Sequence, residues 1–510
     1  MASASSPPLV ALGVLLLLSV SSAIAHGRGA DQERRQRYMV VQTSHLMESK
    51  SICSGFKGTY MCARTIAVMH ALFSSFFAVT PSANGTWVPL HRPYGPCSPS
   101  EGTPPPLVEM LRWDQARTDY VRRKATGEVD DVLDPARPHV DMMQVDFMLR
   151  GTFGIGSGSG YGAAIDGDDD DDPMILAQTM AIDTTEDVPW IQCLPCLIPQ
   201  CYPQRNAFFD PRRSSTGAPV RCGSRACRSL GNYANGCSKA NSTGDCLYRI
   251  EYSDNRLTLG TYMTDTLTIS PSTTFLNFRF GCSHAVRGKF SAQASGTMSL
   301  GGGPQSLLSQ TARAYGNAFS YCVPGPSAAG FLSIGGPVEG DGGGGSGTFA
   351  TTPLVRNANV INPTIYVVRL QGIEVAGRRL NVPPVVFSGG TVMDSSAIIT
   401  RLPPTAYRAL RLAFRNAMRA YRTRAPTGNL DTCFDFVGVT SVTVPAVSLV
   451  FDGGAVIELD LLAVLLDGCL AFAPVAADFA LGFIGNVQQQ THEVLYDVAG
   501  GAVGFRRGAC

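Results

Sequence analysis

The chain has 510 residues, of which 45% are hydrophobic and 16% are charged, and its formal net charge is +1 at pH 7. This composition is typical of an ordered globular protein with two or three domains, and it excludes an intrinsically disordered chain. A net charge so close to zero gives no sign of a nucleic-acid partner or of binding to an anionic membrane.

Residues 1–25 predict a secretory signal peptide. An apolar segment runs from Leu9 to Val20 and is followed by Ala23-Ile24-Ala25, which has the small residues of a cleavage site. The apolar segment is too short for a transmembrane helix, so we expect no membrane span. The sequence therefore predicts a protein that is secreted to the extracellular space or cell wall, or delivered to a vacuole.

Residues 26–150 differ in character from the rest of the chain. Leu107 to Lys124 has apolar residues at roughly helical spacing and a basic end, which predicts an amphipathic helix. Residues 151–173 are rich in glycine and then in aspartate, and are typical of a solvated linker. A calcium site is the alternative for the five consecutive aspartates at 168–172, but an unbroken run lacks the spacing of a chelating loop.

The remaining part of the chain consists of short apolar or alternating runs separated by Gly, Pro and Asn, which predict strands joined by tight turns. Helices are predicted over Pro304–Tyr315 and Pro404–Tyr421, and a flexible joint over Gly340–Gly347. We expect an all-β architecture, mostly strands with a few short helices, that is divided into an N-terminal lobe at residues 174–335 and a C-terminal lobe at residues 336–510.

Cysteine usage agrees with secretion. The chain has 15 cysteines, of which 12 follow residue 150 and seven lie within residues 193–246. An even number of cysteines after a signal peptide predicts disulfides, so residues 193–246 are predicted to form a stapled, loop-rich insert. The pair Cys193 and Cys196 also has the spacing of zinc ligands, which remains an alternative. Asn241 opens an Asn-Ser-Thr sequon, and we expect it to be glycosylated.

Two short segments place an aspartate and a hydroxyl residue after an apolar stretch, Asp183-Thr184 in one lobe and Asp394-Ser395 in the other. Two neighbouring carboxylates hold one proton between them, because the second ionisation would bring two negative charges together. Such a pair polarises a water with one oxygen and protonates a leaving amine with another, with no need for a metal or cofactor. We expect the hydroxyls of Thr184 and Ser395 to brace the two loops against each other.

From Gln178 to the C-terminus the chain resembles the plant pepsin-type aspartic proteases of the nepenthesin-like group. Upstream of the mature part, Trp87–Ser98 and the predicted helix are similar to the propeptide of that group. The segments that carry the resemblance are Asp183–Asp187 with Trp190 and the Cys-x-x-Cys after it, Tyr248–Tyr252, Phe280–Cys282, Ala318–Cys322, Asp394–Pro404, Phe483–Val487 and Val503–Phe505.

The resemblance implies a bilobal pepsin-like acid protease fold with a cleft between the lobes. It implies that Asp183 and Asp394 form the catalytic pair and that Thr184 and Ser395 are supporting hydroxyls. Tyr252 would be the flap tyrosine over the substrate cleft, and Trp190 its hydrogen-bonding neighbour. Residues 26–150 would be a propeptide, and the partners would be a polypeptide substrate and this propeptide. We expect a monomer.

The chain departs from the group at the motif itself, which is Asp-Thr/Ser-Gly-Thr/Ser. Thr185 and Ser396 replace the glycines, and Glu186 and Ala397 replace the following hydroxyl residues. Ser299 also stands for the glycine opposite the first aspartate, whereas Gly485 is kept in the second half. Glycine lets backbone N–H groups approach a carboxylate, so we expect a β-branched Thr185 to crowd the site.

A third carboxylate at Glu186 is expected to raise the pKa values of the pair. The sequence therefore predicts a secreted aspartic-type endopeptidase whose activity is weakened. The alternative is a catalytically inactive protease-like protein that acts as an inhibitor or binding protein.

Overall fold

The computed structural model describes residues 37–42, 79–81, 85–94, 104–127, 148–157, 160–162, 174–196, 199–239, 243–252, 256–270, 272–324, 330–340, 348–355, 360 and 362–508. The predicted signal peptide, the aspartate run, Asn241 and most of the predicted joint at residues 340–347 lie outside these ranges. Within them, no helix is both long and apolar enough to cross a membrane.

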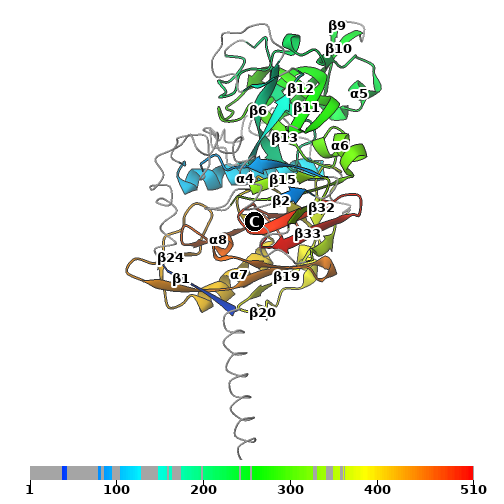
Figure 1. The fold of residues 1–510 in the computed structure, drawn as a ribbon. Helices are drawn as coiled ribbons and strands as arrows, with labels where there is room; N and C mark the ends of the chain where they lie inside the picture. Colours follow the sequence, from blue (N-terminus) through cyan, green and yellow to red (C-terminus); the bar gives the residue numbers. More distant parts are fainter. Residues whose placement is uncertain are drawn as a thin grey trace, which may run out of the picture.

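The N-terminal lobe is built on one ten-stranded sheet, which occupies the upper part of Figure 1. Its main path runs in the order β12-β7-β13-β6-β4-β11-β10-β9, with β5 beside β6 and β8 beside β11. The strands are β4 (Arg150–Ile155), β5 (Gly160–Gly162), β6 (Met174–Asp183), β7 (Trp190–Gln192), β8 (Ala218–Pro219), β9 (Ala234–Lys239), β10 (Thr243–Glu251), β11 (Leu257–Ser270), β12 (Thr273–Arg287) and β13 (Gly296–Ser299).

Within the described residues, the C-terminal lobe contains one five-stranded and two four-stranded sheets. The sheet that carries the second aspartate has the order β18-β21-β31-β22-β30, and the others have the orders β20-β19-β26-β27 and β23-β24-β29-β28. The strands are β18 (Val367–Val368), β19 (Leu370–Val375), β20 (Arg378–Arg379), β21 (Thr391–Met393), β22 (Thr400–Leu402), β23 (Arg422–Arg424), β24 (Cys433–Asp435), β26 (Val447–Phe451), β27 (Val456–Leu459), β28 (Leu465–Leu466), β29 (Cys469–Leu470), β30 (Phe472–Pro474) and β31 (Gly482–Ile484).

A six-stranded sheet joins the two lobes and also takes in a strand from the propeptide-like region. Its order is β17-β33-β32-β14-β15-β3, so β14 and β15 come from the first half of the fold and β32 and β33 from the second. Elsewhere, β1 pairs with β25 at the edge of the C-terminal lobe, and β2 pairs with β16. These strands are β1 (Tyr38–Gln42), β2 (Val79–Pro81), β3 (Thr86–Leu90), β14 (Ala318–Cys322), β15 (Gly330–Ile334), β16 (Val338–Gly340), β17 (Ala350–Pro353), β25 (Ser441–Pro445), β32 (His492–Asp497) and β33 (Ala502–Arg507).

The three predicted helices are present, with small shifts at their ends. The helix expected from Leu107 is α4 (Leu107–Thr126), which ends at Gly127 in the left-handed conformation that glycine favours. The helix expected from Pro304 begins later, as α6 (Leu307–Tyr315), because the Ser306 side chain caps it by accepting the Ser309 N–H. The third helix is α7 (Pro404–Ala417). The short elements are α5 (Arg225–Arg228), α8 (Leu461–Val464), η2 (Pro211–Arg213), η3 (Gly231–Tyr233), η4 (Pro384–Phe387) and η5 (Asp452–Gly454).

The interpretation of residues 151–173 as a linker is wrong for its first part. Residues Arg150–Ile155 form β4, which pairs along its whole length with β6 and also contacts β11. Phe153 and Ile155 on this strand are fully buried. The glycines at 151 and 154 had suggested an irregular chain, but pairing with two long neighbours keeps this segment in the sheet.

Five disulfides join cysteines of the described chain. Cys193 pairs with Cys282 and Cys196 with Cys201, so neither cysteine is a free thiolate and the zinc alternative is wrong. The other three bonds are Cys222–Cys237, Cys227–Cys246 and Cys433–Cys469, and Cys322 is disulfide-bonded as well. The predicted stapled insert at residues 193–246 is therefore present.

Candidate active site

The two aspartate loops are built on the same arrangement of three strands. Asp183 is the last residue of β6, which pairs in parallel with β13, and β13 pairs antiparallel with β7 after the loop. Asp394 directly follows β21, which pairs in parallel with β31, and β31 pairs antiparallel with β22. Each loop thus leaves one strand, turns past the carboxylate and returns on the other side of a shared neighbour.

Backbone N–H groups point at both carboxylates. The N–H of Thr185 donates to Asp183 Oδ1 at 2.8 Å, and the N–H of Ser396 donates to Asp394 Oδ1 at 2.9 Å. Neither Thr185 nor Ser396 has a positive φ, so these two turns do not require glycine. The expectation that Thr185 would crowd the site is wrong, because its own hydroxyl donates to Asp183 Oδ1 at 2.9 Å.

The loops brace each other through their hydroxyl residues. Thr184 Oγ1 lies 3.3 Å from Ser395 Oγ and accepts the Ser395 N–H at 3.2 Å. It also donates to the Met393 carbonyl at 3.4 Å. A further bond from the Ser396 hydroxyl to the Ile182 carbonyl, at 3.2 Å, was not expected from the sequence. The two candidate carboxylates are therefore held on one rigid, buried base.

Arg117, in the middle of α4, lies on both carboxylates at once. Its Nη2 is 2.9 Å from Asp183 Oδ1 and 2.9 Å from Asp394 Oδ1. Its Nη1 donates to Asp183 Oδ2 at 3.1 Å and its Nε to Asp394 Oδ2 at 3.1 Å. The arginine side chain is only 8% exposed, so this bidentate contact is shielded from water. Figure 1 shows α4 between the two lobes.

Farther along the same face of α4, Lys124 and Tyr120 contact the first loop. Lys124 Nζ is 2.7 Å from Glu186 Oε2 and donates to the Thr185 carbonyl at 2.7 Å. The Tyr120 hydroxyl donates to Glu186 Oε1 at 2.8 Å. Glu186, which the sequence indicated as a third carboxylate near the pair, is thus paired with the Lys124 ammonium group and the Tyr120 hydroxyl of the helix.

Other residues of α4 dock the helix on the C-terminal lobe. Asp114 and Arg401 form a buried ion pair at 2.6 Å, and a carboxylate oxygen of Asp114 also accepts the N–H of Ile398. Two groups of apolar contacts flank this pair. Leu111 and Trp113 pack with the cluster around Ile398 and Ile399, and Val121 and Ala125 pack with the cluster around Val392 and Phe483.

The helix changes the electrostatics of the first loop. Burial acts to raise the pKa of Asp183, but the charge and hydrogen bonds of Arg117, with the Thr185 N–H, hold that pKa below its usual value. The predicted rise of the pKa is therefore wrong for Asp183 in this state. Burial raises the pKa of Glu186, and the charge of Asp183 raises it further, against the opposing effect of Lys124.

The predicted flap and its neighbour also meet. β10 and β11 form an antiparallel hairpin, and Tyr252 follows directly after β10. The Trp190 Nε1–H donates to the Tyr252 hydroxyl at 3.1 Å. The ring of Tyr252 lies 6.1 Å from that of Tyr120, so the described end of this hairpin contacts α4.

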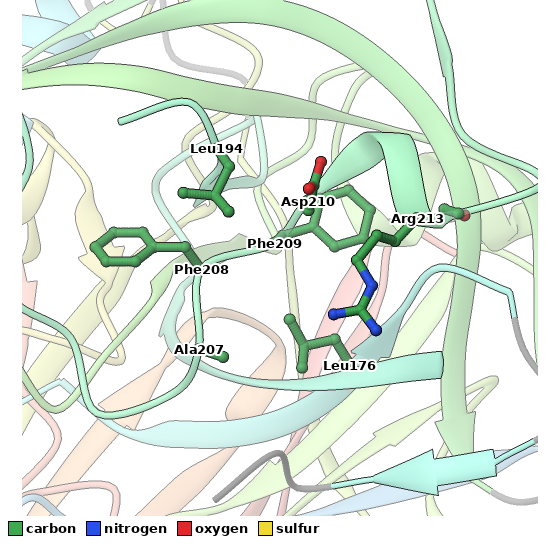
Figure 2. Close-up of a pocket in the computed structure, with 8 residues that line it drawn as sticks. Leu176, Leu194, Ala207, Phe208, Phe209, Asp210 and Arg213 are labelled. Atoms are coloured by element: carbon green, nitrogen blue, oxygen red, sulfur yellow. The ribbon is translucent and has the colours of Figure 1, made fainter. Parts of the chain in front are cut away.

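A separate cavity of about 400 Å³ lies on the N-terminal lobe and is not part of this site. Its lining residues are Leu176, Leu194, Ala207, Phe208, Phe209, Asp210, Arg213 and Ser214, none of which is a candidate site residue. Figure 2 shows the Arg213 guanidinium reaching toward Leu176, with Leu194 and Phe208 on the far side. The Asp210 carboxylate is already paired with Arg212 at 2.7 Å.

Sequence reasoning missed Arg117 as a site residue. The signal was present, because Arg117, Tyr120 and Lys124 follow the i, i+3, i+7 spacing that places side chains on one helical face. The sequence indicated a basic helix and two aspartate loops, but not which cation would meet which carboxylate.

Family comparisons agree with this architecture. Residues 175–336 match the family model described as xylanase inhibitor N-terminal, and residues 365–507 match the one described as xylanase inhibitor C-terminal. An aspartyl protease family protein of Arabidopsis thaliana is 33% identical over 512 residues, covering 98% of each chain. Aspartic proteinase nepenthesin-2 of Nepenthes gracilis is 33% identical over 64% of this chain and 73% of its own length.

Solved structures show the same fold at low identity. The structure of edgp superposes with a TM-score of 0.53 at 19% identity and covers 70% of this chain and 91% of its own. Basic 7S globulin from soybean superposes with a TM-score of 0.51 at 18% identity, over 71% of this chain and 93% of its own.

Proposed function

Because this chain belongs to the plant nepenthesin-like aspartic protease family, we propose that it is a secreted aspartic endopeptidase made as an inactive precursor. One contact supports this function most directly: Arg117 Nη2 lies 2.9 Å from a carboxylate oxygen of Asp183 and of Asp394. A water shared by the two carboxylates would need the place that this nitrogen holds. In the precursor, α4 therefore keeps the pair intact but blocked.

Release of α4 would return the two aspartates to each other. With Arg117 gone, two buried carboxylates at close range cannot both stay ionised, and they would hold one proton between them. The ionised carboxylate would take a proton from a water as it attacks the peptide carbonyl, and the protonated one would donate to that carbonyl oxygen. When the C–N bond breaks, a proton returns to the leaving amine and the products are a carboxylic acid and an amine.

The replaced glycines do not argue against this chemistry. Both carboxylates keep their backbone N–H bonds, at 2.8 Å from Thr185 and 2.9 Å from Ser396. In addition, the Thr185 hydroxyl supplies Asp183 with a side-chain donor, although Glu186 stands at the usual hydroxyl position. These hydrogen bonds support a preorganised site around the pair.

The propeptide-like region is tied to the mature fold by strands as well as by α4. β3 adds to the six-stranded sheet through β15, and β1 adds to the C-terminal lobe through β25. We propose that residues 26–150 are a propeptide which folds with the enzyme and is displaced in acid, when the Asp183 carboxylate that binds Arg117 becomes protonated. The five described disulfides fit an oxidising extracellular or vacuolar compartment.

A second candidate is an inhibitor or binding protein with a silent site. The observation in its favour is that the matching family models are described as xylanase inhibitor domains, and that Ala397 and Ser299 stand where the group has a hydroxyl residue and a glycine. A protein of that kind would not need an arginine buried against its two aspartates.

Acid-dependent proteolysis separates the two candidates. Full-length protein and its Asp183→Asn variant are brought to about pH 3.5, near the ordinary pKa of an aspartate, and given a denatured protein substrate. We expect the wild type to process itself and cleave the substrate, and the variant to be slower by about 10²–10⁴-fold. A peptide that mimics the tetrahedral transition state should block the wild type. Folded, processed wild-type protein that cleaves nothing would contradict the enzyme and favour the binding role.

A further inference from the structure

Lys124 ends in a polar pocket that belongs largely to the N-terminal lobe. Its ammonium nitrogen lies 2.7 Å from Glu186 Oε2, 2.7 Å from the Thr185 carbonyl oxygen and 5.9 Å from the centroid of the Tyr233 ring, which lies on η3. A carboxylate, a carbonyl oxygen and an aromatic face are together the groups that bind an ammonium ion best. These three groups do not come from α4 and stay behind when the helix leaves.

The carboxylate of this pocket comes from a departure from the family motif, because Glu186 stands where the motif has a hydroxyl residue. The Glu186 side chain is 2% exposed beneath α4, and a buried carboxylate is costly unless a cation neutralises it. Departure of the helix removes Lys124 and Tyr120 together. The pocket is then an open anionic site in the first aspartate loop, three residues after Asp183.

Resting on the endopeptidase function proposed above, we propose that the mature cleft binds a lysine side chain of the polypeptide substrate in the place of Lys124, with Glu186 as the residue that determines this specificity. Arg117 and Lys124 are seven residues apart on α4, which is about 10 Å along a helix axis. An extended peptide rises about 3.3 Å per residue, so the bound lysine would lie within about three residues of the scissile bond.

The groups that act on Glu186 set the pH at which this site binds a cation. They are Lys124 and Tyr120 from α4, Asp183 in its own loop, Tyr233 on η3, and Tyr252 after β10. Lys124 is the cation among them, and it leaves with the helix. Only the ionised form of Glu186 attracts an ammonium ion, so the preference for lysine should grow as the pH rises and Glu186 loses its proton.

The test compares matched peptide substrates that differ only in having lysine or norleucine within three residues of the cleaved bond. Acid-processed wild type, Glu186→Gln and a charge-matched control, Asp245→Asn, are assayed at about pH 3.5 and about pH 5.5, on either side of the ordinary pKa of a glutamate. Asp245 is a partly exposed carboxylate on β10 that pairs with Arg221 at 3.4 Å.

At one position we expect the wild type to favour lysine over norleucine in kcat/KM by about tenfold or more at the higher pH, the effect of one charged contact. The preference should shrink at the lower pH, disappear in Glu186→Gln and persist in Asp245→Asn. Wild-type protein that cleaves without favouring lysine, or Glu186→Gln that keeps the preference, would overturn the lysine site and leave the endopeptidase standing. If wild-type protein cleaves neither peptide, both fail. The wild-type pH profile decides the question even if the Glu186→Gln variant does not fold.

Discussion

The two aspartate loops share one strand arrangement, yet α4 treats them differently. In each loop a backbone N–H two residues on binds the carboxylate, and Arg117 reaches both aspartates. The first loop then adds Glu186, which is bound by Lys124. In the second loop the matching position is Ala397, which is fully buried and apolar. Of the two loops, Tyr120 and Lys124 thus contact only the first, whereas Arg117 reaches both aspartates and Asp114 binds Arg401 of the second lobe.

The comparison of the two loops bears on the substitutions in the motif, which do not by themselves indicate a loss of the site. Ser299 on β13 lies opposite Asp183. In the second lobe the corresponding residue is Gly485, which follows β31 and stands beside Asp394. A Cβ at Gly485 would lie 2.6 Å from the Ile398 carbonyl oxygen, so glycine is required there. Ser299 is fully buried at the corresponding place in the first lobe, where its hydroxyl has no hydrogen-bond partner among the described residues. The second loop therefore requires its glycine, whereas the first accommodates a serine at the cost of one buried hydroxyl without a partner among the described residues.

The largest expected effect comes from the residue that binds both loops. Arg117→Met leaves two buried carboxylates without their cation, which should weaken the docking of α4 by about 3–5 kcal/mol. Lys124→Met affects only the first loop. It should weaken docking less, because burial raises the pKa of Glu186 and this side chain can then take up a proton in place of its cation. Hydrogen exchange of residues 107–126 near neutral pH measures both losses.

Arg112→Met is the matched control, since Arg112 is an exposed arginine on the same helix. It should leave hydrogen exchange unchanged. Equal protection of α4 in Arg117→Met and in Arg112→Met would show that the contact with the aspartates does not hold the helix.

An effect of intermediate size is expected in the pH dependence of α4 docking. Asp183 and Glu186 should contribute to it with opposite signs. The pKa of Asp183 is lowered in the docked state, so its contribution to docking is present above the ordinary aspartate pKa and is lost as the pH falls through the lowered value. The pKa of Glu186 is raised, so its contribution is present in acid and is lost as the pH rises through the raised value.

Titrating the hydrogen exchange of α4 against pH tests both signs. We expect Asp183→Asn to reduce the loss of protection in acid. We expect Glu186→Gln to reduce a smaller weakening of docking as the pH rises, while α4 stays docked near pH 7. If the two variants shift the titration in the same direction, the assigned charges in the first loop are wrong.

The smallest expected effect concerns one hydroxyl. Thr185→Val keeps the shape of the side chain but removes the donor to Asp183 Oδ1, and we expect about a tenfold lower kcat/KM, the usual value of a hydrogen bond to a charged group. Ser396→Ala removes a bond to the Ile182 carbonyl instead, so it should lower the melting temperature more than the activity. Both variants are compared by kcat/KM and by thermal unfolding. A larger loss of activity in Ser396→Ala than in Thr185→Val would contradict the roles of these two hydroxyls.

Much of the fold follows from local signals in the sequence. Period-two runs predicted the strands, and Pro404 marked the start of α7. The start of α6 was predicted at Pro304, but the helix begins at Leu307, after the Ser306 cap. β4 was missed because a glycine-rich segment has little strand preference of its own and gains its structure from β6 and β11. Local pattern alone does not contain such long-range pairing.

Some residues of the candidate site could likewise be predicted from the sequence, and others could not. Asp183, Asp394, Thr184 and Ser395 stand out as a repeated motif, and the structure brings all four together. Arg117 meets Asp394 across a separation of 277 residues, so the contact depends on how α4 docks, and docking depends on Asp114, Arg401 and the apolar contacts around them. The sequence showed that the helix was basic, but the partner of each cation came only from the tertiary structure.

The proposed role of α4 is to hold the two aspartates intact and blocked until acid releases the helix. Binding of a transition-state-mimicking peptide to the full-length chain, measured by calorimetry, tests this most directly. We expect no binding near pH 7 in the wild type, tight binding after exposure to about pH 3.5, and binding near pH 7 in Arg117→Met. Tight binding to the untreated wild type near pH 7 while α4 remains protected from hydrogen exchange, or no binding after acid, would contradict this role.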